Sequence, residues 1–214
     1  DYAGGTAVHI NAGAAALALA IVLGKRFGFA KGIMQPHNVP LVLLGAALLW
    51  FGWFGFNVGA EFLNNMENVG LITVNTLGAT AAAILGWLAI EKVKEGKATS
   101  IGAASGAVAG LVAITPACAN VTPFWALVLG VLAGVLSALA VDLKFKLGYD
   151  DSLDVVGIHL VAGLVGTLYL GFFAIDTGLF TGGDAGQLLV QTVAAFGVLV
   201  YSFVLALVIG FAIE

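Results

Sequence analysis

Long apolar stretches decide what this chain can fold into. About seven can be drawn, at residues 5–24, 39–60, 68–90, 100–115, 123–141, 153–174 and 187–213. Each approaches the roughly 20 residues that a helix needs to cross a bilayer. Since 61% of the residues are hydrophobic and only 9% are charged, the composition is not that of a water-soluble globular domain. The sequence predicts an all-α polytopic membrane protein with one transmembrane domain over residues 1–214.

The fourth stretch is short and runs into Thr115-Pro116-Ala117-Cys118. Proline stops a helix, so a non-helical turn is expected after residue 115. Such a turn must be covered by protein or face water. Within the fourth stretch Gly102, Gly106 and Gly110 recur every four residues, a spacing typical of close helix packing in lipid.

Basic residues are confined to every second connection. They follow the first, third and fifth stretches: Lys25, Arg26, Lys31, Lys92, Lys94, Lys97, Lys144 and Lys146. The positive-inside rule places these connections in the cytoplasm, with Asp1 outside the cell membrane and Glu214 inside. The chain begins on Asp1 without a methionine or a signal peptide, so we expect a fragment or a processed product.

Two histidines have matching surroundings in the first and sixth stretches. Both His9 and His159 lie in an aliphatic-His-aliphatic-x-Ala-Gly pattern, and Asp1 and Asp151 precede them by eight residues. An ionisable side chain within apolar membrane sequence indicates function. The two stretches enter the membrane from opposite sides, which is typical of an inverted repeat with its site near the midplane.

The two imidazoles are expected to meet. If Asp1 and Asp151 mark the helix starts, each histidine lies roughly 12 Å deep in a core of about 30 Å. Two neutral imidazoles can share one N–H between them and present their outer nitrogens to a substrate. Alternatives are two unrelated packing histidines, a bis-histidine haem site, or a base for Ser105 as a membrane-protease nucleophile. The third histidine, His37, is expected in a solvated loop.

An aromatic stripe accompanies these histidines in the second stretch. Trp53, Phe56 and Ala60 follow one another at helical spacing, either as packing or as a pore wall. Trp50 would lie about 15 Å deep by helical rise, although tryptophan prefers the interfaces. No acidic residue lies in the middle of a stretch, and no carbonyl-filter motif is present, so a bare cation would be poorly solvated. This favours a neutral or transiently neutralised solute.

Several of these stretches resemble the ammonium transporter family (Amt/Mep/Rh), and in particular its Amt branch. They are DYAGGTAVHINAG at 1–13, PHNVPLVLLGAALLWFGWFGFN at 36–57, NTLGATAAAILGW at 75–87, GAVAGLVAITPACANV at 106–121 and DDSLDVVGIHLVAG at 150–163. The resemblance implies an inverted-repeat fold of eleven helices, of which this chain would hold the fifth to the eleventh. It also implies a homotrimer with one pore per subunit.

The resemblance further implies roles for individual residues. His9 and His159 match the paired pore histidines, Trp53 matches a pore-lining tryptophan, and Phe56 matches one of two phenylalanines that occlude the outer pore. Asp1 matches the acid near the outer recruitment site. Asp154 matches the aspartate that precedes the second histidine. Where many bacterial members have a serine that contacts ammonium, this chain has Ala60.

The function expected from the resemblance is ammonium transport. The protein would recruit ammonium at its outer mouth, deprotonate it and conduct ammonia past His9 and His159, without acting as an enzyme and without a cofactor, metal or nucleic acid. The lipid bilayer and ammonium would be its partners. A regulator of the PII type would act through a tail beyond Glu214. The alternative is an ammonium sensor or receptor on the same fold, with an added signalling domain.

Overall fold

The chain folds into a bundle of long helices. The computed structural model describes residues 1–29, 36–63 and 65–214. In chain order its elements are the π-helix η1 (Thr6–Ile10), α1 (Asn11–Leu23), α2 (Val39–Asn57), the 3-10 helix η3 (Gly59–Leu63), α3 (Val69–Glu95), α4 (Ser100–Ile114), α5 (Pro123–Ala140), α6 (Leu143–Leu147), the π-helix η4 (Val156–Val161), α7 (Ala162–Phe173) and α8 (Ala185–Ile213).

Within the described ranges, six helical segments are long and apolar enough to cross a membrane. They are Thr6–Leu23, Val39–Phe62, Val69–Glu95, Pro123–Leu147, Val156–Phe173 and Ala185–Ile213. The remaining apolar helix, α4, covers Ser100–Ile114 and is shorter, as its sequence predicts. The described residues contain no β-strand. The predicted all-α polytopic membrane fold is therefore confirmed.

Side-chain caps begin several of these helices. The Asn38 side chain accepts a hydrogen bond from the Leu41 backbone N–H, and Pro40 lies in the first turn of α2. Thr99 caps α4 through the Gly102 N–H, and Asp184 caps α8 through the Gly186 N–H. Because these oxygens satisfy backbone donors that have no partner within the helix, they define where these three helices start.

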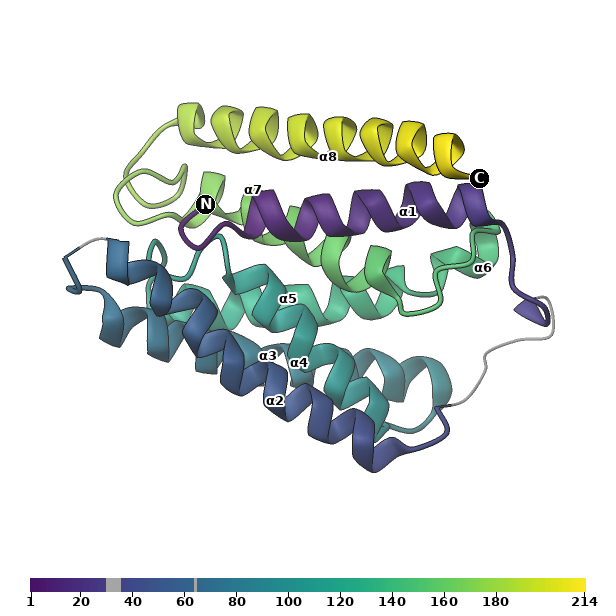
Figure 1. The fold of residues 1–214 in the computed structure, drawn as a ribbon. Helices are drawn as coiled ribbons and strands as arrows, with labels where there is room; N and C mark the ends of the chain where they lie inside the picture. Colours follow the sequence, from purple (N-terminus) through teal and green to yellow (C-terminus); the bar gives the residue numbers. More distant parts are fainter. Residues whose placement is uncertain (30–35, 64) are drawn as a thin grey trace.

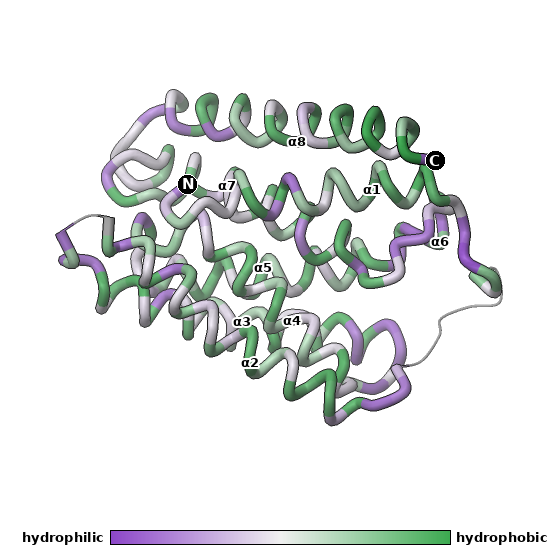
Figure 2. The backbone as a smooth tube through the Cα atoms, in the orientation of Figure 1, coloured by the Kyte–Doolittle hydropathy of each residue, from purple (hydrophilic) through white to green (hydrophobic). Residues whose placement is uncertain are grey.

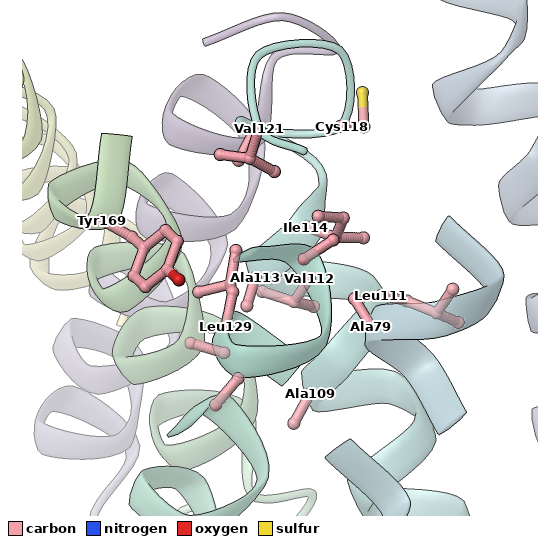
Figure 3. Packing of buried hydrophobic residues seen from close by; sticks show 14 of the residues in the cluster. Ala79, Ala109, Leu111, Val112, Ala113, Ile114, Cys118, Val121, Leu129 and Tyr169 are labelled. Carbon is pink, nitrogen blue, oxygen red and sulfur yellow. The ribbon is translucent and has the colours of Figure 1, made fainter. Parts of the chain in front are cut away.

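The helices form two packed groups (Figure 1). α3 packs against α4 and α5, while α1 packs against α8 and against η4. α7 joins the groups, since it contacts α4, α5 and α8. Most of α4 is buried, and its residues form the centre of the apolar cluster in Figure 3.

Glycines allow the closest helix contacts in this core. A Cβ built on Gly110 would lie 2.6 Å from the Ala83 Cβ, and one on Gly130 would lie 2.2 Å from the Ala79 carbonyl oxygen. Gly106 faces Ala83 and Trp87 in the same way. The small-residue face predicted on α4 therefore packs against α3.

The turn after α4 lies inside the protein. Ala117, Cys118 and Val121 are fully buried, and the Asn75 side-chain amide donates to the carbonyls of Cys118 and Val121 at 2.9 and 2.8 Å. Since these carbonyls leave the helical hydrogen-bonding pattern, the amide replaces the water that would otherwise satisfy them. The expected non-helical turn after residue 115 is confirmed, and of the two environments open to it the structure shows the one in which protein covers Ala117, Cys118 and Val121.

Polar residues gather at the two ends of the bundle, and apolar residues follow the helices between them (Figure 2). The described basic residues lie at one end, which holds the C-terminal ends of α1 and α3 and the short helix α6. This distribution agrees with the alternation predicted from the connections.

Candidate functional site

Two π-helical turns carry the two histidines. η1 contains His9 and η4 contains His159, and each turn continues directly into an α-helix, α1 or α7. π-Turns are rare and occur frequently at functional sites. The sequence patterns around the histidines did not predict this local change of helix type.

An aspartate side chain accepts backbone N–H groups at the start of each π-turn. The Asp1 carboxylate accepts the N–H of Thr6 at 2.7 Å, and the Asp151 carboxylate accepts the N–H groups of Val155 and Val156 at 3.0 and 2.7 Å. Both acids therefore mark helix starts, as their matching positions predict. Each compensates the positive end of the helix that carries a histidine.

The two histidine rings are in contact in the middle of the bundle. The Nδ1 atoms of His9 and His159 lie 3.4 Å apart, and the ring centroids are separated by 5.5 Å. For this contact to be a hydrogen bond, one ring must carry its N–H on Nδ1 and the other on Nε2, because a neutral imidazole carries one N–H. His9 is 3% exposed, and its Nε2 atom has no hydrogen-bond partner among the described residues.

Two aromatic rings of α2 stack on His9. The Trp53 ring centroid lies 5.3 Å from that of His9 at an interplanar angle of 21°, and the Phe56 centroid lies 5.9 Å away at 24°. Trp53 is held by a hydrogen bond of 2.8 Å from its Nε1 to the Thr115 hydroxyl. The α2 stripe thus lies over the histidine site.

Ala60 does not continue this stripe as an α-helical residue. α2 ends at Asn57, and Ala60 lies in the following 3-10 helix, η3. Trp50 is partly buried and packs against the apolar core. The stripe near the histidines therefore consists of Trp53 and Phe56.

A hydroxyl pair joins the two histidine segments beside the site. The Thr6 and Thr167 hydroxyl oxygens are 2.7 Å apart, and both residues are buried. Thr6 begins η1, which leads to His9, and Thr167 lies in α7, which continues from η4. This contact ties one histidine-bearing segment to the helix that follows the other.

Asp154 lies at the start of η4 and pairs with a buried lysine. The Lys144 ammonium contacts the Asp154 carboxylate at 2.5 Å and donates to the Asp151 carbonyl oxygen at 3.1 Å. Burial raises the pKa of Asp154, while the hydrogen bond from Lys144 acts in the opposite direction. The Asp154 side chain is therefore bound to α6, and it is Asp151 that caps η4.

A second ion pair joins the end of α1 to the segment before η4. Arg26 donates from Nε and from its terminal nitrogen to the two Asp150 carboxylate oxygens at 2.8 and 2.7 Å, and its backbone N–H adds a third bond. The side-chain hydrogen bond from Arg26 holds the pKa of Asp150 below its usual range. The two histidine-bearing segments are thus tied together at their basic end.

The other proposed histidine chemistries find less support in this geometry. Imidazole nitrogens 3.4 Å apart make a direct contact, whereas the two axial bonds of a bis-histidine haem, each about 2.0 Å and on opposite faces of the iron, would separate them by about 4 Å. Ser105 lines a cavity of about 460 Å³ together with Trp87 and Asp154. No hydrogen bond joins Ser105 to His159 within the described ranges. His37 is exposed, as predicted.

Comparison with known proteins identifies the fold. The family model described as the Ammonium Transporter Family matches residues 1–214. The chain belongs to the ammonium transporter family. An ammonium transporter of Mycobacterium tuberculosis is 58% identical over 226 residues, covering 100% of this chain and 47% of the relative.

Solved structures of the family have the same fold as this member. The crystal structure of Candida albicans Mep2 matches with a TM-score of 0.90 at 36% identity, over 98% of this chain and 49% of that one. A structure described as a Sensor Amt Protein also gives 0.90, at 33% identity over 100% of this chain and 54% of that one. The chain thus spans about half the length of the relatives that it matches, and within that half it is a multi-pass membrane protein.

Sequence reasoning overlooked three side chains around the site. Lys144 was assigned only to a charged connection, although it is buried against η4. Thr115 precedes a proline, and nothing in the sequence pairs it with Trp53. Asp151 was interpreted only as a helix start and not as one of the acids of the site. The signal for it was its spacing: Asp151 precedes His159 by eight residues, as Asp1 precedes His9.

Proposed function

We propose that the full-length protein transports ammonium, and that ammonia passes the contact between His9 and His159 after ammonium has lost a proton. The observation that carries this proposal is the unpaired Nε2 atom of the buried His9. A buried polar nitrogen without a partner destabilises a protein by about 1–3 kcal/mol. Its retention beside a second imidazole is accounted for when a small hydrogen-bonding solute binds there.

The histidine contact supplies two complementary groups. When the Nδ1 of one ring donates to the Nδ1 of the other, the Nε2 of the donating ring is free to accept a hydrogen bond. The accepting ring carries its own N–H on Nε2, which can donate one. Ammonia has N–H donors and one lone pair, so it can pair with either outer nitrogen. The assignment therefore holds for both tautomer arrangements of the pair.

The surroundings favour a neutral solute at this point. Trp53 and Phe56 cover His9 with aromatic surface, and no carboxylate is hydrogen-bonded to either imidazole in the described chain. An ion stripped of water is strongly disfavoured in such surroundings. We assign Phe56, which is 38% exposed, to the outer approach, and Trp53 to the wall beside the histidines.

Near the outer mouth, the main role of Asp1 would be to stabilise the start of η1. Its carboxylate is bound to the backbone of η1, and this negative charge also lies where ammonium would arrive. Asp154 would serve a structural role through Lys144. The orientation follows from the basic residues: Asp1 outside, and Glu214 in the cytoplasm.

Assembly and regulation of the whole protein belong to the same proposal. By family resemblance it would form a homotrimer in the cell membrane, and residues beyond Glu214 would receive a PII-type regulator. Residues 1–214 would form one transmembrane domain together with the remaining helices. No cofactor is required for the proposed passage of ammonia.

Uptake of labelled methylammonium by the full-length protein tests the assignment. We expect His9→Ala and His159→Ala to change flux or selectivity strongly, because each removes one partner of the contact. His37→Ala is the matched control, since His37 is exposed in a loop. Unchanged flux and selectivity in both site variants would reject the role of the pair.

A sensor is the second candidate function, because a structure described as a Sensor Amt Protein shares the fold over the whole of this chain. A sensor would bind ammonium without sustained flux. Ligand-dependent signalling by the full-length protein, together with negligible methylammonium uptake by the wild type, would favour this alternative.

A further inference from the structure

The two histidine segments cross at two glycines. Gly13 follows His9 by four residues, and Gly163 follows His159 by four. A Cβ built on Gly13 would lie 2.4 Å from the Leu160 Cβ and 2.5 Å from the Leu160 backbone nitrogen. A Cβ built on Gly163 would lie 3.2 Å from the His9 Cβ and 3.3 Å from the Ile10 backbone nitrogen.

These approaches are reciprocal. The glycine after His159 packs against His9 itself, and the glycine after His9 packs against Leu160, the residue directly after His159. The separation of the two backbones at the histidines is therefore set from both segments. The Nδ1 atoms are 3.4 Å apart, at the long end of the range for a hydrogen bond, so little further separation is tolerated.

We infer that Gly13 and Gly163 are positioning residues that hold His9 and His159 in contact. A methyl group at Gly163 would have to move the His9 Cβ by a few tenths of an ångström. At Gly13 the obstacle is backbone, so the segments themselves would have to separate. The graded contacts predict a graded displacement of the two imidazoles, smaller for a substitution at Gly163 than for one at Gly13.

Other close glycines serve packing without touching this pair. Gly130 and Gly134 approach the α3 backbone at Ala79 and Ala83, and Gly166 approaches α4 at Ala113. Substitutions there would strain the contacts with α3 and α4 rather than the contact between the two histidine turns. Gly13 and Gly163 differ because the atoms they approach belong to the two histidine turns.

Gly163→Ala in the full-length protein provides the test, with Gly78→Ala as the matched control. A Cβ on Gly78 would lie 3.3 Å from the Leu127 Cδ2, nearly the same clearance but far along the chain from either histidine. The histidine hydrogen bond is measured by nitrogen-15 NMR of the imidazoles, through the coupling between the two Nδ1 atoms. Thermal unfolding is recorded for each variant.

We expect Gly163→Ala to lose the coupling between the imidazoles and Gly78→Ala to keep it, at comparable unfolding temperatures. Uptake should fall about tenfold in Gly163→Ala and about 100-fold in Gly13→Ala, as expected when reacting groups are displaced by a fraction of an ångström to about 1 Å. Retention of the coupling in Gly163→Ala would overturn the inference, as would its equal loss in Gly78→Ala.

The effect on uptake rests on the proposed function, whereas the NMR readout does not. If both histidine→Ala variants transport normally and Gly163→Ala still loses the coupling, the positioning role stands and the transport role fails. If the histidine variants lose transport and Gly163→Ala keeps the coupling, the proposed function stands and the positioning role fails.

Discussion

Gly4 and Asp154 lie five residues before the two histidines, and both have a left-handed backbone, with φ of 83° and 58°. Their carbonyls accept equivalent hydrogen bonds at 2.8 Å, from Val8 and from Ile158. The first motif uses a glycine for this conformation, whereas the second uses an aspartate bound to Lys144. The two π-turns are therefore built on the same backbone plan with different side chains.

Replacing Asp154 by glycine and by alanine separates backbone strain from the ion pair. Both variants lose the contact with Lys144, but only alanine keeps a Cβ at positive φ. We expect Asp154→Gly to exceed Asp154→Ala in free energy of unfolding by about 1 kcal/mol. Denaturant unfolding in detergent micelles measures this, and equal stability of the two variants would contradict it.

The hydrogen bond between Trp53 and Thr115 should be visible in a double-mutant cycle. Trp53→Phe removes the indole donor, and Thr115→Val removes the hydroxyl acceptor, which also donates to the Leu111 carbonyl. We expect a coupling energy of about 1 kcal/mol in thermal unfolding. Thr115→Ser keeps the hydroxyl and should retain the coupling. If the losses of stability in Trp53→Phe and Thr115→Val simply add in the double variant, the contact is contradicted.

Two glycines of the spans should respond oppositely to alanine. Among the described residues, no atom lies within 4 Å of a Cβ built on Gly52 in α2, so Gly52→Ala in residues 1–214 should stabilise the helix by up to about 1 kcal/mol. Gly130→Ala would bring a methyl group 2.2 Å from the Ala79 carbonyl oxygen and should destabilise by about 1–3 kcal/mol or more. Melting temperatures in one detergent compare them, and a stable Gly130→Ala would contradict the close packing of α5 on α3.

Acid stability should depend on Arg26 and Asp150. The bond from Arg26 lowers the pKa of Asp150 in the folded protein, so its stabilisation is complete above the ordinary pKa of about 4 and is lost as the pH falls through the lower folded value. The difference in free energy of unfolding between wild type and Asp150→Asn should therefore shrink with acidification.

The matched variant for this pair is Arg26→Lys. It keeps the charge but loses the two-pronged geometry, so it should show a smaller version of the same pH dependence. Unfolding is followed from neutral pH to about pH 2 across the transition range of Asp150. A stability difference that does not vary with pH would remove the assigned role of this pair.

Sequence periodicity predicted the spans to within a few residues, because lipid requires long continuous apolar helices. The contact between His9 and His159 was predicted from the two matching motifs, because the stretches that carry them enter the membrane from opposite sides. The expected turn at Pro116 followed from the chemistry of proline alone. These features depend on local composition or on the internal repeat.

Contacts between unrelated segments were not predictable in the same way. Lys144 resembles the other basic residues of the connections, yet it is buried against η4. The π-turns differ from α-helix by one hydrogen-bond register, which apolar periodicity over five or six residues does not resolve. Ala60 does not continue the stripe of Trp53 and Phe56, because α2 ends at Asn57 and a 3-10 helix follows. The sequence did not predict this end, because no proline marks it.

The antiparallel course of η1 with α1 and of η4 with α7 has an electrostatic consequence. Their peptide dipoles point in opposite directions where His9 and His159 meet, so the two backbone fields largely cancel there. The repeated backbone by itself therefore favours neither direction across the imidazoles. Within residues 1–214, side chains that stack on only one of the two rings, such as Trp53 and Phe56 on His9, supply an asymmetry there.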